Sequence, residues 1–172
     1  MQAGVKKKIN PSPFKYRRAR MSEAELVKVK VKHLNNLQNQ IITEKHTLIT
    51  DEPEASGGDE LAVNPIELVL GAEGACTVSV LMMFAKRMKY DLKGVEISLT
   101  HRRIRAEEIK DAAVEPDNER GYVHKIEKNI KFIGNLDEDQ IEELQRVSRR
   151  CPVHNMIEKR SYFEISFDHA DN

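Results

Sequence analysis

Apolar and polar residues alternate along several stretches of the chain, and this two-residue period is typical of half-buried β-strands. The stretches with this period are residues 27–31, 40–50, 94–105, 122–133 and 161–167. The second is long enough for one or two short strands. In the last, Phe163, Ile165 and Phe167 are expected to face inward.

A different pattern covers residues 66–88, which are almost wholly apolar until Lys86. A helix that is apolar all round is typically buried on every side. Asn64 suits the N-cap, Pro65 the first helical position, and Glu67 the reciprocal place in a capping box. We therefore predict a long central helix, and its internal glycines leave open a break along its length.

A second helix is predicted after Asp137, where Gln140 completes a capping-box pattern. Apolar residues follow at helical spacing as far as Cys151, and Pro152 is expected to end the helix. Strands separated by helices in this order indicate an α+β fold with largely antiparallel pairing. A central helix in so short a chain needs cover on every side, which a second subunit would supply.

The composition excludes several classes of protein. With 172 residues, 40% of them hydrophobic, the chain suits one globular domain. No uninterrupted apolar run reaches the roughly 18 residues of a membrane helix, and the N-terminus lacks the apolar core of a secretory signal. Two cysteines do not form a secreted disulfide framework. We therefore expect a cytoplasmic protein without a membrane span.

The net charge of zero hides an asymmetry between the two ends of the chain. Residues 1–20 contain seven lysines and arginines and no acidic residue, so the remainder carries a net charge of −7. A body of that sign is a poor generic nucleic-acid binder, and no nucleic-acid partner is expected. We predict a basic flexible extension over residues 1–22 and a folded domain over residues 23–172.

The two cysteines are the residues most suited to chemistry. Cys76 lies in the central helix and Cys151 at the end of the second, each on an apolar face. Buried free cysteines are commonly inert, which is one interpretation of both thiols. If the helices pack, the two sulfurs can meet and cycle between dithiol and disulfide. A metal site at Cys151 and His154 is a further alternative, but two ligands make only half a site and no metal is predicted.

Seven motifs occur in a fixed order along the chain: residues 46–53, 57–58, 65–68, 71–77, His101, 134–137 and 151–154. Together they resemble the OsmC/Ohr family over residues 24–168, in particular an OsmC-like branch separate from the best-known peroxidases. The resemblance implies an α+β OsmC-like fold, with antiparallel sheets around a long buried central helix and a second helix. It also implies an intertwined homodimer with its active sites at the subunit interface.

The same resemblance implies a thiol-dependent reductase of organic hydroperoxides that acts in oxidative-stress defence without a cofactor. Cys76 would be the peroxidatic cysteine and Cys151 the resolving one, with a lipoyl-type or similar external dithiol as reductant. The alternative function is an OsmC-like small-molecule-binding or redox-sensing protein without efficient peroxidase turnover.

The resemblance also defines what should ionise the reactive thiol: an Arg from an N-terminal strand, held by a carboxylate just after the helix-starting proline. Ile66 occupies that carboxylate position, and Glu67 follows it on the face opposite Cys76 of an ideal helix. No Arg occurs between Arg20 and Arg87.

We therefore expect the charge to come from Arg103 or from a lysine of the N-terminal strands. Glu67, which also suits a capping role, or Glu73, on the same helix face as Cys76, would be the carboxylate. Three histidines are expected to lie around the reacting groups: His46, His101 and His154.

Overall fold

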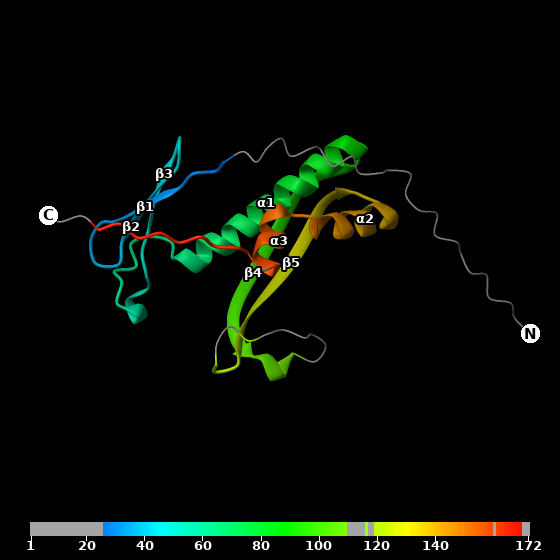
Figure 1. Ribbon diagram of the computed structural model, residues 1–172. Coiled ribbons are helices and arrows are strands. Elements are labelled where there is room, and N and C mark those ends of the chain that lie inside the picture. Colours follow the sequence, from blue (N-terminus) through cyan, green and yellow to red (C-terminus); the bar gives the residue numbers. More distant parts are fainter. Residues whose placement is uncertain (1–25, 110–115, 117–118, 160, 170–172) are drawn as a thin grey trace, which may run out of the picture.

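The computed structural model describes residues 26–109, 116, 119–159 and 161–169 (Figure 1). Its regular elements are β1 (Lys30–His33), β2 (Asn39–Ile42), β3 (Thr47–Thr50), α1 (Pro65–Met88), β4 (Asp91–Arg105), β5 (Tyr122–Asn135), α2 (Glu138–Ser148) and α3 (Pro152–Glu158), with short 3₁₀ turns at Glu54–Ser56 and Ala106–Glu108. The predicted basic extension over residues 1–22 lies outside the described residues.

The long helix α1 begins where the sequence predicts it. The Asn64 side chain accepts a hydrogen bond from the Glu67 N–H, and the Glu67 carboxylate accepts one from the Asn64 N–H, each at 2.9 Å. This reciprocal capping box satisfies two N–H groups that have no partner inside the helix. The helix then runs unbroken past both internal glycines, so it has no break, and it ends at Lys89 in the left-handed conformation.

Strands β4 and β5 form a long antiparallel hairpin that lies along α1 (Figure 1). The register shifts by one residue between Leu92 and Gly94. Opposite that shift, Gly134 has a φ of 153°, and a Cβ there would lie 2.0 Å from the carbonyl oxygen of Asp91. Only glycine fits this close approach. The chain then enters α2, whose first turn is capped by the Asp137 side chain.

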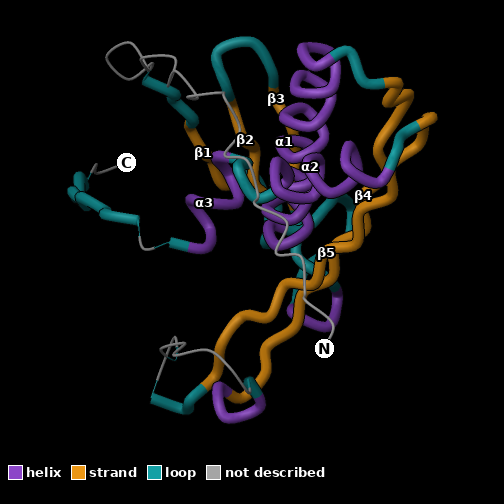
Figure 2. Tube along the Cα trace, turned by 90° about the vertical axis from the view of Figure 1, so that its right-hand side faces the viewer, coloured by secondary structure: helices purple, strands orange, loops and turns teal. Residues whose placement is uncertain are grey.

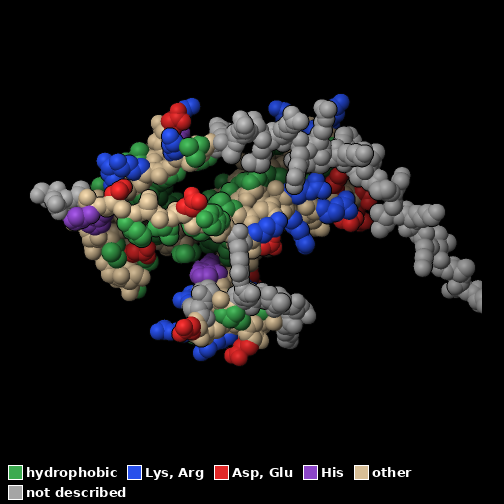
Figure 3. All heavy atoms as spheres, in the orientation of Figure 1, with side chains coloured by type: hydrophobic (Ala, Val, Ile, Leu, Met, Phe, Trp, Pro, Cys, Tyr) green, Lys and Arg blue, Asp and Glu red, His purple; other side chains and the backbone are tan. Residues whose placement is uncertain are grey.

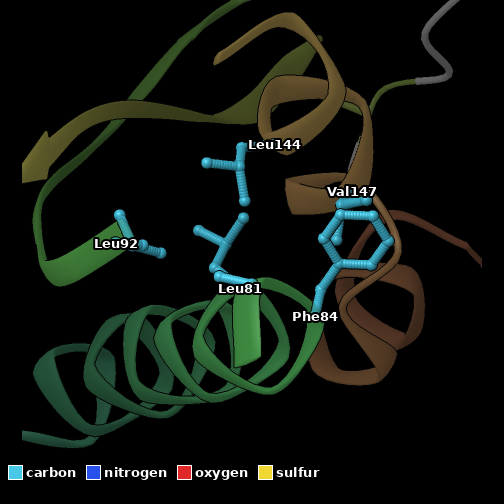
Figure 4. Packing of buried hydrophobic residues seen from close by; sticks show 6 residues of the cluster. Leu81, Phe84, Leu92, Leu144 and Val147 are labelled. Carbon is cyan, nitrogen blue, oxygen red and sulfur yellow. The ribbon is translucent and has the colours of Figure 1, made fainter. Parts of the chain in front are cut away.

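The apolar core lies where α1, α2 and the start of β4 meet (Figure 4). Its buried members are Leu81, Phe84, Ala85, Leu92, Leu144 and Val147. Leu81 and Leu144 are fully buried and face each other across the two helices. The predicted helical spacing of α2 is thus confirmed by the face that it buries.

The first three strands form a separate antiparallel sheet in the order β1-β2-β3, beyond the N-terminal end of α1 (Figure 1). The loop that follows is organised by the buried side chain of Asp51, which accepts hydrogen bonds from the N–H groups of Glu52, Asp59 and Leu61. Val31 in β1 and Val29 just before it remain more than half exposed, at 58% and 55%.

Two predictions for the C-terminal part are wrong. Pro152 does not end a helix but begins α3, because proline is favoured in the first turn, where its missing N–H is not needed. Residues 161–167 have no strand pairing within the subunit, and Phe163 and Phe167 are 77% and 90% exposed. Figure 2 shows this segment extended away from the helices and sheets. A strand needs a neighbour to pair with, and the described residues offer none here.

The expectation that α1 is buried on all sides is also not met within one subunit. Its buried residues lie between Glu73 and Ala85, whereas Ile66, Val69 and Met83 of the same helix are 46%, 44% and 65% exposed. Hydrophobic side chains accordingly remain visible on the surface in Figure 3. By length and composition α1 would also be sufficient to cross a membrane, with only 28% of its most apolar 18-residue window buried.

Candidate active site

The two cysteines come together from different elements. Cys76 lies in the middle of α1 and is half-buried, whereas Cys151 lies at the N-cap of α3 and is fully buried. The two side chains lie close enough for each to shift the pKa of the other, and both are free thiols. The packing of α3 against α1 therefore produces a dithiol from residues 75 positions apart in the sequence.

Cys151 is held by the backbone around it. Its sulfur accepts a hydrogen bond from the His154 N–H at 3.4 Å and lies 3.9 Å from the carbonyl oxygen of Glu73. The N–H contact favours a thiolate, while the carbonyl receives the S–H of the neutral form. The His154 N–H remains available for this contact because the residue that lacks an N–H, Pro152, occupies the first position of α3.

The environment shifts the pKa values of the two thiols in opposite directions. Burial raises the pKa of the Cys76 thiol, and the hydrogen bond with Cys151 and the negative charge of Glu73 raise it further. Burial also opposes ionisation of Cys151, but hydrogen bonds from Cys76, the His154 N–H and Thr77 outweigh it and lower the pKa of Cys151. Within the subunit, the first proton of the pair therefore leaves Cys151.

Glu73 is the buried charge of the site, with a side chain only 4% exposed. Its Oε1 atom lies 2.7 Å from Lys128 Nζ, accepts a hydrogen bond from the Thr77 hydroxyl at 3.2 Å, and lies 3.4 Å from His154 Nδ1. Its Oε2 atom is buried without a hydrogen-bond partner among the described residues. One turn of α1 thus places a carboxylate, a hydroxyl and a thiol beside α3 and β5.

Of the residues that the sequence singled out, Cys76, Cys151, Glu73 and His154 lie together. Glu67 lies at the start of α1 and is exposed, where it caps the helix. The Arg103 guanidinium lies in the hairpin, 5.2 Å from the centre of the Tyr122 ring.

The other two histidines also lie outside the thiol cluster. His101 stacks on His124, with 2.7 Å between His101 Nε2 and His124 Nδ1. His46 is exposed in the turn between β2 and β3. The site therefore draws on α1, α3 and β5 and not on the N-terminal sheet.

Lys128 is the residue that the sequence analysis missed. It stands between Ile126 and Ile130 on the face of β5 that the alternation predicts to be inward. A lysine on an apolar strand face is rarely buried unless it has a charged partner. The position of Lys128 on this face is therefore the sequence signal that indicates a buried ion pair. Its side chain is only 17% exposed.

No group of three or more metal-binding side chains occurs in the part of the chain that the structure describes. The pair Cys151 and His154 does lie together, but the His154 ring faces Glu73 and Glu158. The arrangement accordingly offers thiol chemistry, with an ion pair beside it.

Comparison with solved structures shows the fold. The OsmC-like protein of Mycoplasma pneumoniae superposes with a TM-score of 0.62 at 17% identity, covering 78% of this chain and 89% of that one. An organic hydroperoxide resistance protein OsmC of Legionella pneumophila gives 0.58 at 20% identity, covering 78% and 90%. The organic hydroperoxide resistance protein OhrB of Bacillus subtilis gives 0.52 at 18% identity, covering 76% and 88%.

A family model adds evidence from the sequence. The search of curated proteins finds no match to this chain. The model described as OsmC-like protein, by contrast, matches residues 57–166, which include both cysteines, Glu73, Lys128 and His154. This match spans more than half of the sequence and agrees with the resemblance of its motifs and with its α+β architecture. The chain belongs to the OsmC-like protein family.

Proposed function

We propose that the protein is a two-cysteine, thiol-dependent reductase of organic hydroperoxides, with Cys76 as the nucleophile and Cys151 as the resolving thiol. The observation that carries the proposal is the pairing of a half-exposed thiol with a fully buried one, close enough for each to shift the pKa of the other. A substrate reaches the exposed sulfur, and the buried sulfur is already in place to condense with the product.

The lowered pKa of Cys151 gives it a second role in this scheme. The Cys151 thiolate takes the proton of Cys76, and the Cys76 thiolate attacks the terminal oxygen of the hydroperoxide. The O–O bond breaks, Cys76 becomes a sulfenic acid, and the alkoxide takes the proton from Cys151 to leave as an alcohol.

The Cys151 thiolate then attacks the Cys76 sulfur, and a disulfide forms as hydroxide leaves. The hydroperoxide has been reduced to an alcohol and two thiols have been oxidised. An external dithiol, of the lipoyl type or similar, would return the pair to its starting state by thiol–disulfide exchange.

The exposed apolar surfaces support a homodimer as the active form. Helix α1 and the C-terminal segment 161–167 both present large apolar side chains to solvent within one subunit. Burying such surfaces against a second copy removes them from water. Proteins of this family are soluble and typically dimeric, and we propose a cytoplasmic homodimer in which the partner covers the site.

One observation favours the alternative function, a binding or redox-sensing protein without efficient turnover. Arg103, the arginine expected to ionise the thiol, lies in the hairpin against Tyr122 rather than beside Cys76. The raised pKa of Cys76 also reduces the fraction of its reactive thiolate at neutral pH.

Stopped-flow consumption of an organic hydroperoxide and of hydrogen peroxide, with excess dithiol, distinguishes the two functions. Wild type, Cys76→Ser and Cys151→Ser are compared. We expect turnover in the wild type with the organic substrate preferred, none in Cys76→Ser, and a single sulfenic acid without a disulfide in Cys151→Ser. Wild-type consumption no faster than that of Cys76→Ser would exclude the reductase and leave the binding function.

A further inference from the structure

Lys128 is a largely buried cation that contacts Glu73, the carboxylate beside the thiol pair. It reaches Glu73 Oε1 from β5, and the two side chains are 17% and 4% exposed. Two opposite charges at 2.7 Å with so little solvent around them interact much more strongly than a surface pair does.

The carboxylate of this ion pair is connected to both thiols. Its charge is one of the causes that raise the pKa of Cys76. Its Oε1 atom accepts a hydrogen bond from the Thr77 hydroxyl, and Thr77 also helps to lower the pKa of Cys151. An unneutralised carboxylate at this position would oppose thiolate formation on either sulfur.

The charged groups around Glu73 come from two elements, β5 and α3. They are Lys128 of β5, His154 of α3, and Glu158, whose Oε2 atom lies 3.8 Å from His154 Nε2. Arg149 and Arg150 precede Cys151, but both are exposed. Among the residues that the structure describes, Lys128 is therefore the permanent positive charge in contact with Glu73.

The unpartnered Oε2 atom of Glu73 distinguishes this pair from one kept only for stability. A buried ion pair offsets the penalty of leaving water only when the remaining lone pairs are also satisfied. Here one carboxylate oxygen is buried without a partner among the described residues. Such an arrangement is weak support for the fold and is better explained by a role in the site.

We propose that Lys128 is the activating cation of the thiol pair and that Glu73 is the positioning residue that holds it there. This inference rests on the proposed function, since it assigns the charge that a thiol reductase needs. Lys128 balances the carboxylate and thereby allows negative charge to form on the neighbouring sulfurs, in place of an arginine from the N-terminal strands.

Thiol titration tests the proposal without any peroxide. Thiolate absorbance is followed against pH in the protein as purified, whether it is a monomer or a dimer. The Cys151→Ser variant reports the pKa of Cys76, and the Cys76→Ser variant reports the pKa of Cys151. In each background we expect Lys128→Met to raise the pKa of the remaining thiol, because the substitution leaves Glu73 unneutralised. We expect Glu73→Gln to lower that pKa, because the substitution leaves Lys128 unneutralised. Each change should alter the ionisation constant about tenfold.

The double variant Glu73→Gln/Lys128→Met should return the pKa to near the wild-type value, and Lys128→Arg should keep it there. A general loosening of the site would move both single variants in the same direction. Two single variants that shift the pKa in the same direction, or not at all, would overturn the proposal. A shift in His154→Gln with none in Lys128→Met would also overturn it and assign the cation to His154.

Circular dichroism of every variant separates a changed charge from a lost fold, and Lys128→Arg provides the folded comparison if Lys128→Met fails to fold. If the proposed function itself is wrong, the result is different: the wild type does not consume hydroperoxide, whatever the titration shows. If the wild type does turn over, Lys128→Met should lower kcat about tenfold and move the pH profile of kcat to higher pH, with KM little changed.

Discussion

The two halves of α1 bury opposite kinds of residue against the same subunit. Toward its C-terminal end the helix contributes Leu81 and Phe84 to an apolar core with α2. Two turns earlier it buries Glu73 and Thr77, beside Cys76, against β5 and α3. One continuous helix therefore links a region built for stability to a region built for thiol chemistry.

The difference shows how the fold supports a charge in its interior. The apolar half gains free energy from every methylene group that leaves water. The polar half gains little, because removing Glu73 and Lys128 from water is nearly as unfavourable as their attraction is favourable. We infer that the apolar half anchors α1 so that the polar half can hold its side chains in place.

The largest effect should come from a cavity in the apolar half. Leu81 is fully buried, so Leu81→Ala should lower the free energy of unfolding by about 4 kcal/mol. Urea unfolding followed by circular dichroism measures it, with Ser79→Ala on the exposed side of the same helix as the matched control. A loss in Leu81→Ala no larger than that in Ser79→Ala would show that this half does not anchor the helix.

The next largest effect should come from the polar half. Lys128→Met leaves the Glu73 carboxylate buried without its cation and should lower the free energy of unfolding by about 3 kcal/mol. Glu73→Leu/Lys128→Met removes both charges and should recover most of that loss. If the double variant is less stable than Lys128→Met, the ion pair contributes to folding on its own account, and the contrast between the two halves is wrong.

A smaller effect is expected where a polar contact borders the apolar half. The Tyr90 hydroxyl donates a hydrogen bond to Glu143 at 2.5 Å. This bond and, to a smaller extent, burial raise the pKa of Tyr90 to about 12. The bond stabilises the fold while Tyr90 is protonated in both states. Its contribution should therefore be complete below pH 10 and decline as the pH rises toward 12.

Tyr90→Phe should lower the free energy of unfolding by about 1 to 2 kcal/mol at pH 8. Between pH 10 and pH 12 the difference from wild type should shrink. Urea unfolding of both proteins at several pH values measures this, and a difference that stays constant to pH 12 would contradict the role of the hydrogen bond.

The sequence predicts the elements of the apolar half well, because their signals are local. The capping residues Asn64 and Asp137 mark both helix starts, and the spacing of Leu144 and Val147 marks the buried face of α2. The alternation of residues 94–105 and 122–133 marks β4 and β5. Each of these signals depends on residues within a few positions of one another.

The C-terminal segment 161–167 has the same kind of local signal, yet it is not a strand in the subunit. Alternation indicates that a segment has one apolar face, but only a neighbouring strand can satisfy its backbone. The signal of Pro152 is ambiguous for a related reason: proline can end one helix or favour the start of another, and only the packing of α3 on α1 decides between them.

The site could be predicted only in part. Cys76 and Cys151 are conspicuous by residue type, and Glu73 and His154 by their spacing from them. Lys128 was missed because it approaches from β5, 55 residues from its partner, and nothing local links the two. The charge of Arg103 suits the site, but the register of the hairpin pairs Arg103 with His124, and its guanidinium lies over the Tyr122 ring.

The smallest effect should come from a second lysine of β5, which forms a matched pair with the first. Lys131 lies three residues after Lys128 and also contacts a glutamate, Glu96, at 2.9 Å, but these side chains are 67% and 63% exposed. Water screens the exposed pair, so Lys131→Met should change the free energy of unfolding by less than about 0.5 kcal/mol. Raising the salt concentration should remove even that difference, while the loss in Lys128→Met should persist. Equal losses in the two variants would show that burial is not what distinguishes the thiol region from the surface of the hairpin.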